Sequence, residues 1–312
     1  MRLSLYLMAL AGANIVLGFG YNWYLLTWLG PGRPTDALFA GMMIPQVLAA
    51  VVGGALTNAL VPMLSVEAAS RRALLGWTFA QAVLLATGGG AILLALAAPL
   101  WVPLTVPAFD ADAVRLTIHL LRVQLIGVVL LSVATVQRAI HNAAHRYIWV
   151  EVTGLIATVA GLGVLVGGLR VWGVEAAAWA TVAKAVLHGT LLLPAMGSYH
   201  GPAWGRPELR RAWQRLWPLM AGSLYYKSDV VLDRTLGSLA APGVLSVYHL
   251  AHQAYASAQL VLGKAIVGPA VPALGRAAER GDWTVFRRIT RRRLAAVLLI
   301  AIAGFIALVL VG

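Results

Sequence analysis

Residues 51–68 read VVGGALTNALVPMLSVEA, and residues 261–278 read VLGKAIVGPAVPALGRAA. The two stretches are identical at seven positions at a constant offset of 210 residues, which aligns Pro272 with Pro62. Both are apolar, and neither has the alternation of polar and apolar residues typical of a transmembrane β-strand. Two similar apolar segments so far apart predict an internal repeat built from helices.

The composition extends this apolar character to the whole chain. Hydrophobic residues make up 60% of the 312 residues and charged residues only 11%, whereas a soluble domain carries about a quarter charged residues. Segments of about 20 apolar residues match the hydrocarbon thickness of a bilayer when they are helical. Helices also satisfy their own backbone hydrogen bonds in lipid. The sequence therefore predicts an all-α integral membrane protein.

Proline, glycine and charged clusters divide the chain into about nine transmembrane helices. We expect them at residues 4–28, 36–63, 74–98, 115–137, 147–168, 174–195, 214–238, 243–273 and 294–311. Arginines gather in the loops after the even-numbered helices, whereas the opposite loops hold only Arg33 and Arg170. Because cytoplasmic loops carry the excess of positive charge, the N-terminus is predicted to be cytoplasmic. The formal charge of +13 then indicates basic loops on anionic lipid rather than binding of nucleic acid.

The repeat also predicts the organisation of the chain into lobes. Its two copies both run from outside to inside and lie six helices apart, and parallel repeats of this kind are a known transporter architecture. We expect a six-helix lobe at residues 1–200 and the first three helices of a second, parallel-repeat lobe at residues 201–312. The sequence is therefore expected to be a fragment, with the missing C-terminal helices supplied by the rest of the chain or by another subunit.

A set of short motifs lies in the first, second, seventh and eighth helices. The first two hold Leu17-Gly18-Phe19, Gly30-Pro31-Gly32, Thr35-Asp36-Ala37, Ile44-Pro45, Gly54-Ala55 and Leu60-Val61-Pro62-Met63-Leu64-Ser65. The later motifs are Asp233-Arg234, Leu239, Pro242-Gly243, Ser246, Gly263, Pro272 and Gly281-Asp282. Together they resemble the MurJ/MviN family of the multidrug/oligosaccharidyl-lipid/polysaccharide exporter superfamily. The resemblance implies two six-helix lobes around a central cavity, and a flippase that moves lipid-linked sugars, notably lipid II, from the inner to the outer leaflet.

The chain departs from this family where the resemblance implies charged residues. The family's charged positions fall on Ile15, Tyr21-Asn22, Ala49, Ala50, Gly53-Gly54 and Ala251-His252-Gln253. The family's arginines at such positions are thought to clamp an anionic diphosphate, for which guanidinium is suited because it forms bidentate hydrogen bonds. In this chain the clamp is almost wholly absent, while Asp36 is kept.

Ionisable residues at bilayer depth are candidates for a cavity, because a charge in lipid is costly. The substrate-binding candidates are Asp36, Lys227, Asp229, Arg234, His252, Gln253 and Lys264. Three of them would be replacement cations for an anionic head group: Lys227, Arg234 and Lys264. Alternatively, Lys227 and Arg234 form structural ion pairs with Asp229 and Asp233, or reach the outer surface.

Two further polar positions each allow two interpretations, and a third is expected to form a pair. Asp36 either caps the helix at 36–63 or gates substrate or ions. His252, with His249 on the same helix, either titrates and couples transport to a proton gradient or bonds to a neighbouring helix. Lys184 is expected to form a packing pair with Glu151.

Proline and glycine residues interrupt the two helices of the repeat and are candidate hinges for alternating access. They are Pro45, Gly53, Gly54, Pro62, Gly263, Pro269 and Pro272. Each proline removes a backbone hydrogen bond and favours a kink. Static packing is the alternative, since both residue types are common in membrane helices.

The remaining motifs point away from an enzyme. The basic segment 276–293 contains seven arginines and is expected to be a surface helix on anionic lipid. The chain has no cysteine and none of the common nucleotide, zinc or serine-hydrolase motifs, so no cofactor and no metal site are expected. We expect a bacterial inner-membrane flippase whose partners are membrane lipid and a polyprenyl-linked glycan. The alternatives are a non-transporting homologue that scaffolds cell-envelope assembly proteins, and an exporter of another amphiphile or polysaccharide precursor.

Overall fold

The computed structural model describes residues 2–201, 203–205, 207–227, 229–262, 274 and 281–311. Its regular elements within these ranges are all helices. The predicted all-α class is therefore correct. Contacts divide the chain into two compact units, Met1–Leu250 and Ala251–Gly312. The lobe boundary near residue 200 is a property of the repeat and stays a prediction.

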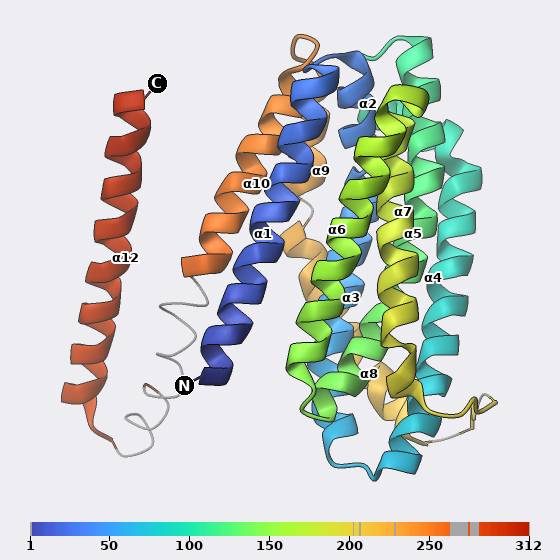
Figure 1. Cartoon of the computed structure of the whole chain (residues 1–312), viewed down its shortest axis with the longest axis vertical. Coiled ribbons are helices and arrows are strands. Elements are labelled where there is room, and N and C mark those ends of the chain that lie inside the picture. Colours follow the sequence, from blue (N-terminus) through green and yellow to red (C-terminus); the bar gives the residue numbers. More distant parts are fainter. Residues whose placement is uncertain are drawn as a thin grey trace. The chain divides into compact units, whose positions relative to one another are not determined.

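The helices follow the predicted order (Figure 1). They are α1 (Arg2–Leu29), α2 (Arg33–Gly41), α3 (Met43–Ser65), α4 (Ala69–Thr105), α5 (Ala111–Ala143), α6 (Tyr147–Trp172), α7 (Glu175–Leu192) with the 3₁₀ turn η1 (Leu193–Met196), α8 (Pro207–Lys227), α9 (Asp229–Ser238), α10 (Val244–Leu262) and α12 (Trp283–Val311). By length and apolar composition alone, the described residues contain four helical spans able to cross a bilayer: Arg33–Ser65, Ala69–Thr105, Ala111–Ala143 and Tyr147–Trp172.

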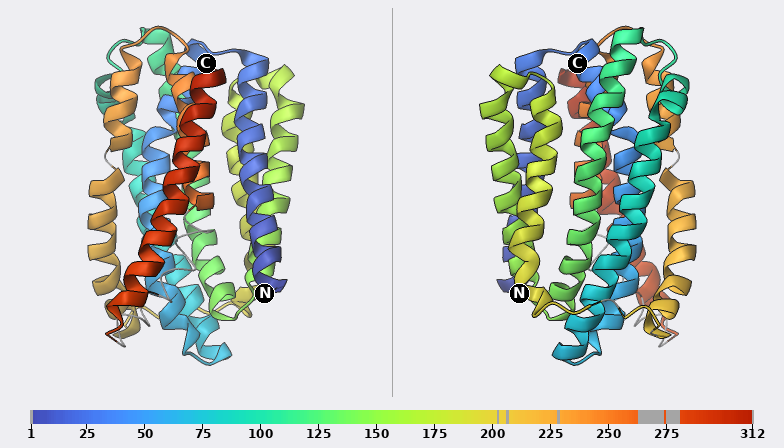
Figure 2. Two further views of the ribbon diagram at one scale, coloured as in Figure 1. Left: turned by 90° about the vertical axis from the view of Figure 1, so that its left-hand side faces the viewer. Right: turned by 90° about the vertical axis from the view of Figure 1, so that its right-hand side faces the viewer.

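Helix α5 forms the centre of the first unit. It packs against α2, α3, α4, α6 and α7, and its leucines Leu120, Leu121 and Leu125 are buried in the apolar core. The turns after α3, α5 and α7 lie at one end of this unit, and those after α1, α4, α6 and α9 lie at the other (Figure 1). We call them the cytoplasmic end and the outer end, because the first set holds the arginine-rich loops. Figure 2 shows α1 beside α6, with which it is in contact.

One of the predicted helices is broken. The second consists of α2 and α3, which meet at Met42, because Pro45 has no N–H to donate to the carbonyl of Gly41. A Cβ atom at Gly41 would lie 3.1 Å from the carbonyl oxygen of Thr117, so glycine allows α2 to approach α5 closely. The seventh consists of α8 and α9, which lie on either side of residue 228, a position outside the described residues.

The second unit contains the end of α10 and helix α12. The expectation of a separate surface helix at 276–293 is wrong for residues 283–293, which form the first turns of α12. Residues 283–294 contain no glycine or proline, so the sequence has no signal that would end the helix at Arg293. Asp282 precedes α12 and accepts a hydrogen bond from the N–H of Val285 (3.0 Å). Residues 276–280 lie outside the described residues.

Candidate functional site

Asp36 joins α2 to the first turn of α10 at the outer end. It is buried, with 2% of its surface exposed, and accepts hydrogen bonds from the N–H of Gly243 (2.6 Å), the N–H of Ser246 (2.9 Å) and the Ser246 hydroxyl (2.6 Å). The first N–H groups of a helix lack intrahelical partners and carry partial positive charge, so this carboxylate caps α10. The expectation that Asp36 caps its own helix is wrong, because the Thr35 hydroxyl accepts from Gly32 at the start of α2 (3.0 Å).

Glycine at position 243 makes this contact possible. Its φ of 92° lies in the left-handed region that side chains rarely adopt. A Cβ atom there would also lie 3.0 Å from the backbone of Pro31. Both features allow the start of α10 to approach the loop before α2, which brings two backbone N–H groups within reach of Asp36.

The contact joins equivalent positions of the repeat. Ser246 follows Asp36 by 210 residues, which is the offset of the repeat. His249 follows Phe39 by the same number, and their rings stack with centroids 4.1 Å apart. Two residues related by a twofold axis touch each other only where they lie at the axis. In both contacts the two partners are therefore separated by the repeat offset, while the relation between the lobes stays a prediction.

Arg234 makes a second connection across this junction. The residue is 5% exposed, and its guanidinium donates to the carbonyl oxygen of Phe39 (2.5 Å) and to the side-chain oxygen of Gln46 (2.5 Å). A third contact, of 3.2 Å, reaches Nδ1 of His249. Arginine has no acceptor atom, so His249 accepts there and its Nδ1 carries no proton. We call Asp36, Arg234 and the groups that they contact the outer junction.

The expected ion pairs along the seventh helix do not form within the described residues. Arg234 bonds to neutral acceptors, as given above. Asp229 accepts from the N–H of Val230 (2.8 Å), and Asp233 accepts from the hydroxyl of Tyr248 (2.6 Å). Among the described residues, the hydrogen-bond partners of the buried Arg234 are therefore a carbonyl oxygen, an amide oxygen and an imidazole nitrogen rather than a carboxylate.

The other predicted site residues lie elsewhere. Lys227 is exposed at the last residue of α8. His252 is exposed and Gln253 is half-buried on α10, in the unit that begins at Ala251. Lys264 lies outside the described residues. The structure thus brings together Asp36 and the surroundings of Arg234 within the first unit.

Two adjoining cavities lie between α3 and the helices α5 and α7. The first, of about 340 Å³, is lined by Met42, Pro45, Gln46, Ala49, Gln124, Gly127, Val128, Leu131, Thr181, Lys184, Ala185 and His188. The second, of about 390 Å³, is lined by Ala49, Ala50, Gly53, Gly54, Thr57, Asn58, Leu131, Ser132, Thr135 and Arg138. The two share Ala49 and Leu131, and Gln46 connects the first to the outer junction through its bond to Arg234.

Each cavity contains one cation that sequence reasoning assigned otherwise. Lys184 lines the first cavity, and among the described ion pairs none joins it to Glu151. Arg138 lines the second cavity, although the sequence suggests a residue of a cytoplasmic loop. The sequence did not predict this position, because Arg138 lies near the end of a hydrophobic segment and only the packing of α5 on α3 decides which way its side chain points.

The small residues that replace the family's charges line the second cavity. Ala49, Ala50, Gly53 and Gly54 form its α3 wall. Of the hinge candidates, Pro45 causes the break between α2 and α3, whereas α3 continues as a helix through Gly53, Gly54 and Pro62 to Ser65. The others, Gly263, Pro269 and Pro272, lie outside the described residues.

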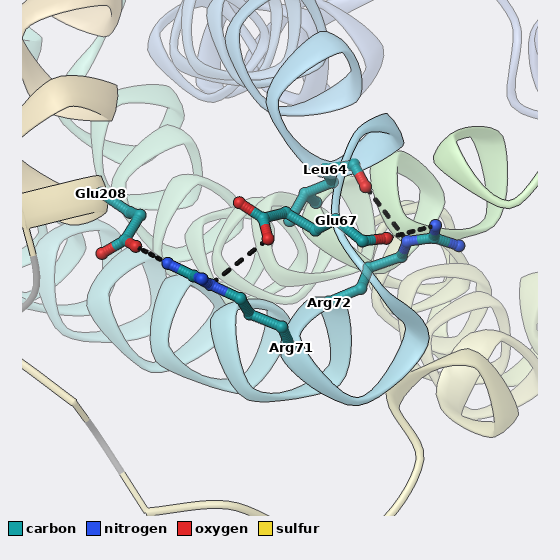
Figure 3. Close-up of polar contacts among 5 residues, drawn as sticks. All are labelled: Leu64, Glu67, Arg71, Arg72 and Glu208. Atoms are coloured by element: carbon teal, nitrogen blue, oxygen red, sulfur yellow. Dashed lines mark hydrogen bonds and ion pairs between the residues drawn. The ribbon is translucent and has the colours of Figure 1, made fainter.

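A charged cluster connects α3, α4 and α8 at the cytoplasmic end (Figure 3). Arg71 forms ion pairs with Glu67 (3.3 Å) and with Glu208. Arg72 donates to the carbonyl oxygens of Leu64 (3.1 Å) and Glu67 (2.9 Å). Arg72 thereby caps the C-terminal end of α3, and Arg71 ties the same turn to the first turn of α8.

A bundle of membrane-spanning helices with polar cavities between them is typical of a multi-pass membrane transporter. A family model described as "Lipid II flippase MurJ" matches residues 25–312. The chain belongs to this family.

Solved structures of transporters share the fold. A lipid II flippase MurJ in an inward closed conformation superposes with a TM-score of 0.69 at 17% identity, covering 88% of this chain and 59% of that chain. An inward-facing multidrug resistance MATE family transporter of the MOP superfamily superposes with a TM-score of 0.70 at 17% identity, covering 96% and 68%. A MOP superfamily transporter from Pyrococcus furiosus gives 0.63 at 17% identity, covering 96% and 70%. The chain thus spans 59% of the length of the MurJ structure that it matches.

Proposed function

We propose that this chain is part of a flippase that carries a lipid-linked sugar precursor across the bacterial inner membrane by alternating access. The substrate is lipid II or a related polyprenyl-diphosphate glycan, and it moves from the inner to the outer leaflet. Family membership supports the class of substrate. The outer junction supports the mechanism, and it is the observation on which the proposal rests.

Alternating access requires an end that closes and reopens. The outer junction is closed by hydrogen bonds from one buried acid and one buried arginine, Asp36 and Arg234. Hydrogen bonds of this kind contribute about 1.5–3 kcal/mol each when a charged group takes part, which is strong enough to hold one state and weak enough to be released. A twofold axis between α2 and α10 is where two lobes would rock against each other.

The cavities fit an amphiphile with an anionic head group. Lys184 and Arg138 are their cations, and the surrounding groups are amides, hydroxyls and small apolar residues. The bond between Gln46 and Arg234 offers a path by which filling the first cavity would loosen the outer junction. In this scheme the lipid tail stays in the bilayer while the head group passes along the inner face of α3.

Growth rescue tests the proposal. Bacteria depleted of their own lipid II flippase would be supplied with the full-length gene, and with a matched Asp36→Ala variant expressed to the same membrane level. We expect growth with the first and none with the second. Failure of the unaltered gene at normal membrane abundance would contradict the proposal.

A second function is favoured by one observation, the uncharged α3 wall of the second cavity. Ala49, Ala50, Gly53 and Gly54 offer no cation to a diphosphate, which suits a scaffold for cell-envelope assembly proteins. A scaffold would leave fluorescent lipid II on its original side of reconstituted vesicles. Redistribution of lipid II between leaflets, absent in protein-free vesicles, would exclude the scaffold as the sole function.

A further inference from the structure

Arg138 lies on α5 where that helix faces α3. It is half-buried and lines the cavity of about 390 Å³ shared by the two helices. The residue stands five positions before the end of α5 at Ala143, which is about 8 Å at 1.5 Å per residue. The side chain therefore lies near the cytoplasmic mouth of the cavity and inside it.

The guanidinium of Arg138 is not satisfied by its surroundings in the described part of the chain. Its Nε is buried and has no hydrogen-bond partner there. The described ion pairs do not include it, and the residues that line the cavity with it include no carboxylate. A buried donor left unpaired costs about 1–3 kcal/mol, so this arrangement suits a ligand that accepts hydrogen bonds and carries negative charge.

The other polar groups of the cavity leave room for such a ligand. The hydroxyls of Thr57, Ser132 and Thr135 donate to carbonyl oxygens of their own helices, at 2.9, 2.8 and 2.9 Å. Asn58, exposed on α3, adds an amide N–H₂ group. The donors that face the cavity are thus a guanidinium fork and an amide, a combination that binds a phosphoryl group well.

The depth of Arg138 fits a phosphate group at the inner leaflet. Arg115, near the outer end of α5, and Arg138 are 23 residues apart on one helix, which corresponds to about 35 Å. The hydrocarbon core of a bilayer is about 30 Å thick. By its length alone this stretch of α5 is long enough to cross the core, which would place Arg138 at the level of the phosphates of the cytoplasmic leaflet.

We propose that Arg138, assisted by Asn58, forms a phosphoryl-binding site at the cytoplasmic mouth of the α3–α5 cavity, where the phosphate of an amphiphilic ligand enters from the inner leaflet. The identification of that ligand as the transported head group rests on the proposed function. The site itself does not, because a phospholipid phosphate has the same chemistry.

Binding of inorganic pyrophosphate to the full chain in maltoside micelles tests the site. We expect Arg138→Gln to weaken binding at least about tenfold, and Arg138→Lys to weaken it severalfold because an ammonium lacks the fork. The matched control is Arg211→Gln, which removes the same charge from an exposed arginine of α8 outside this cavity. Its affinity should stay within about twofold of the unaltered chain, as for a distant surface charge.

The outcomes separate the site from the transport function. Equal affinity for pyrophosphate in the unaltered chain and in both Arg138 variants overturns the site, as does equal weakening by Arg211→Gln. Native mass spectrometry then distinguishes the sources: loss of bound phosphatidylglycerol in Arg138→Gln identifies a phospholipid site, and unchanged lipid with lost pyrophosphate identifies a site for a transported head group. If the unaltered chain fails to rescue flippase-depleted bacteria but shows Arg138-dependent binding, the transport proposal falls and the site stands. Should Arg138→Gln not fold, Arg138→Lys decides alone.

Discussion

Ser246 donates two hydrogen bonds to Asp36, its own equivalent 210 residues earlier in the repeat. The contact is asymmetric in chemistry although symmetric in position: one lobe supplies a carboxylate and the other supplies a hydroxyl and the start of a helix. The stack of Phe39 on His249 repeats this relationship one turn further along. Under the proposed rocking of the lobes this contact would need little sliding, so a few hydrogen bonds would be enough to control it.

Replacing Asp36 by alanine should unlock the start of α10. The variant leaves the N–H groups of Gly243 and Ser246 and the Ser246 hydroxyl without their acceptor. Loss of a cap costs about 0.5–2 kcal/mol, and a buried charged acceptor adds to this. Hydrogen exchange of these two amides should therefore accelerate by roughly 10-fold or more.

Asp229→Ala is the matched control for this experiment. Asp229 is an exposed acid that accepts from Val230 in its own helix, so its removal should leave exchange at Gly243 and Ser246 unchanged. If Asp36→Ala also leaves these amides protected, the carboxylate does not hold the junction closed.

Arg234→Gln should destabilise the protein far more than Arg71→Gln. The first change removes donors from Phe39 and Gln46 at a site that is 5% exposed, and each buried acceptor left unsatisfied costs about 1–3 kcal/mol. Arg71 is half exposed, with 50% of its side chain accessible, and such ion pairs contribute little. Thermal unfolding in detergent, followed by tryptophan fluorescence, should show the larger fall in Tm for Arg234→Gln. A fall of equal size in both variants would mean that the junction arginine is not a special anchor.

The sequence contains the topology more completely than the site. Helix positions follow from apolar length, and the break at Met42 follows from Pro45, because both signals are local. The contact between Asp36 and Ser246 could not be predicted, because the offset of 210 residues relates the two positions in sequence without saying that they touch. The cavity role of Arg138 could not be predicted either, because it depends on the packing of α5 against α3, and a charge near a helix end has the same local pattern whether it faces lipid, loop or cavity.

Asp282 should titrate below the usual range of an aspartate. Its carboxylate accepts from the Thr284 hydroxyl (2.7 Å) and from the N–H of Val285 (3.0 Å), and these bonds lower the pKa of Asp282. The stabilisation of the first turn of α12 is therefore fully present above the ordinary pKa of about 3.9 and is lost as the pH falls through the lower folded value. Carbon-13 NMR of the carboxyl group measures this directly.

Thr284→Val should raise the pKa of Asp282 toward its ordinary value, because the Thr284 bond is the largest cause of the shift. Thr290→Val is the control: that hydroxyl donates to the carbonyl oxygen of Phe286 and should leave the titration of Asp282 unchanged. A value for Asp282 at or above the ordinary one in the unaltered chain would contradict the cap.

Gly54→Ala should separate a hinge from a packing requirement, and Gly41→Ala provides the comparison. A Cβ atom at Gly54 would meet nothing within 4 Å, whereas one at Gly41 would lie 3.1 Å from the carbonyl oxygen of Thr117 and 3.2 Å from the nitrogen of Leu121. Backbone atoms cannot move aside easily, so overpacking in Gly41→Ala should lower the free energy of unfolding by about 1–3 kcal/mol. The Tm of this variant should fall accordingly. Gly54→Ala should raise Tm, because alanine favours a helix over glycine by about 1 kcal/mol.

If α3 bends at Gly54 during transport, the same variant should rescue flippase-depleted bacteria less well although it is more stable. A more stable variant that transports at the normal rate would leave Gly54 as a residue that merely lines the cavity, and would move the bend to the break at Met42.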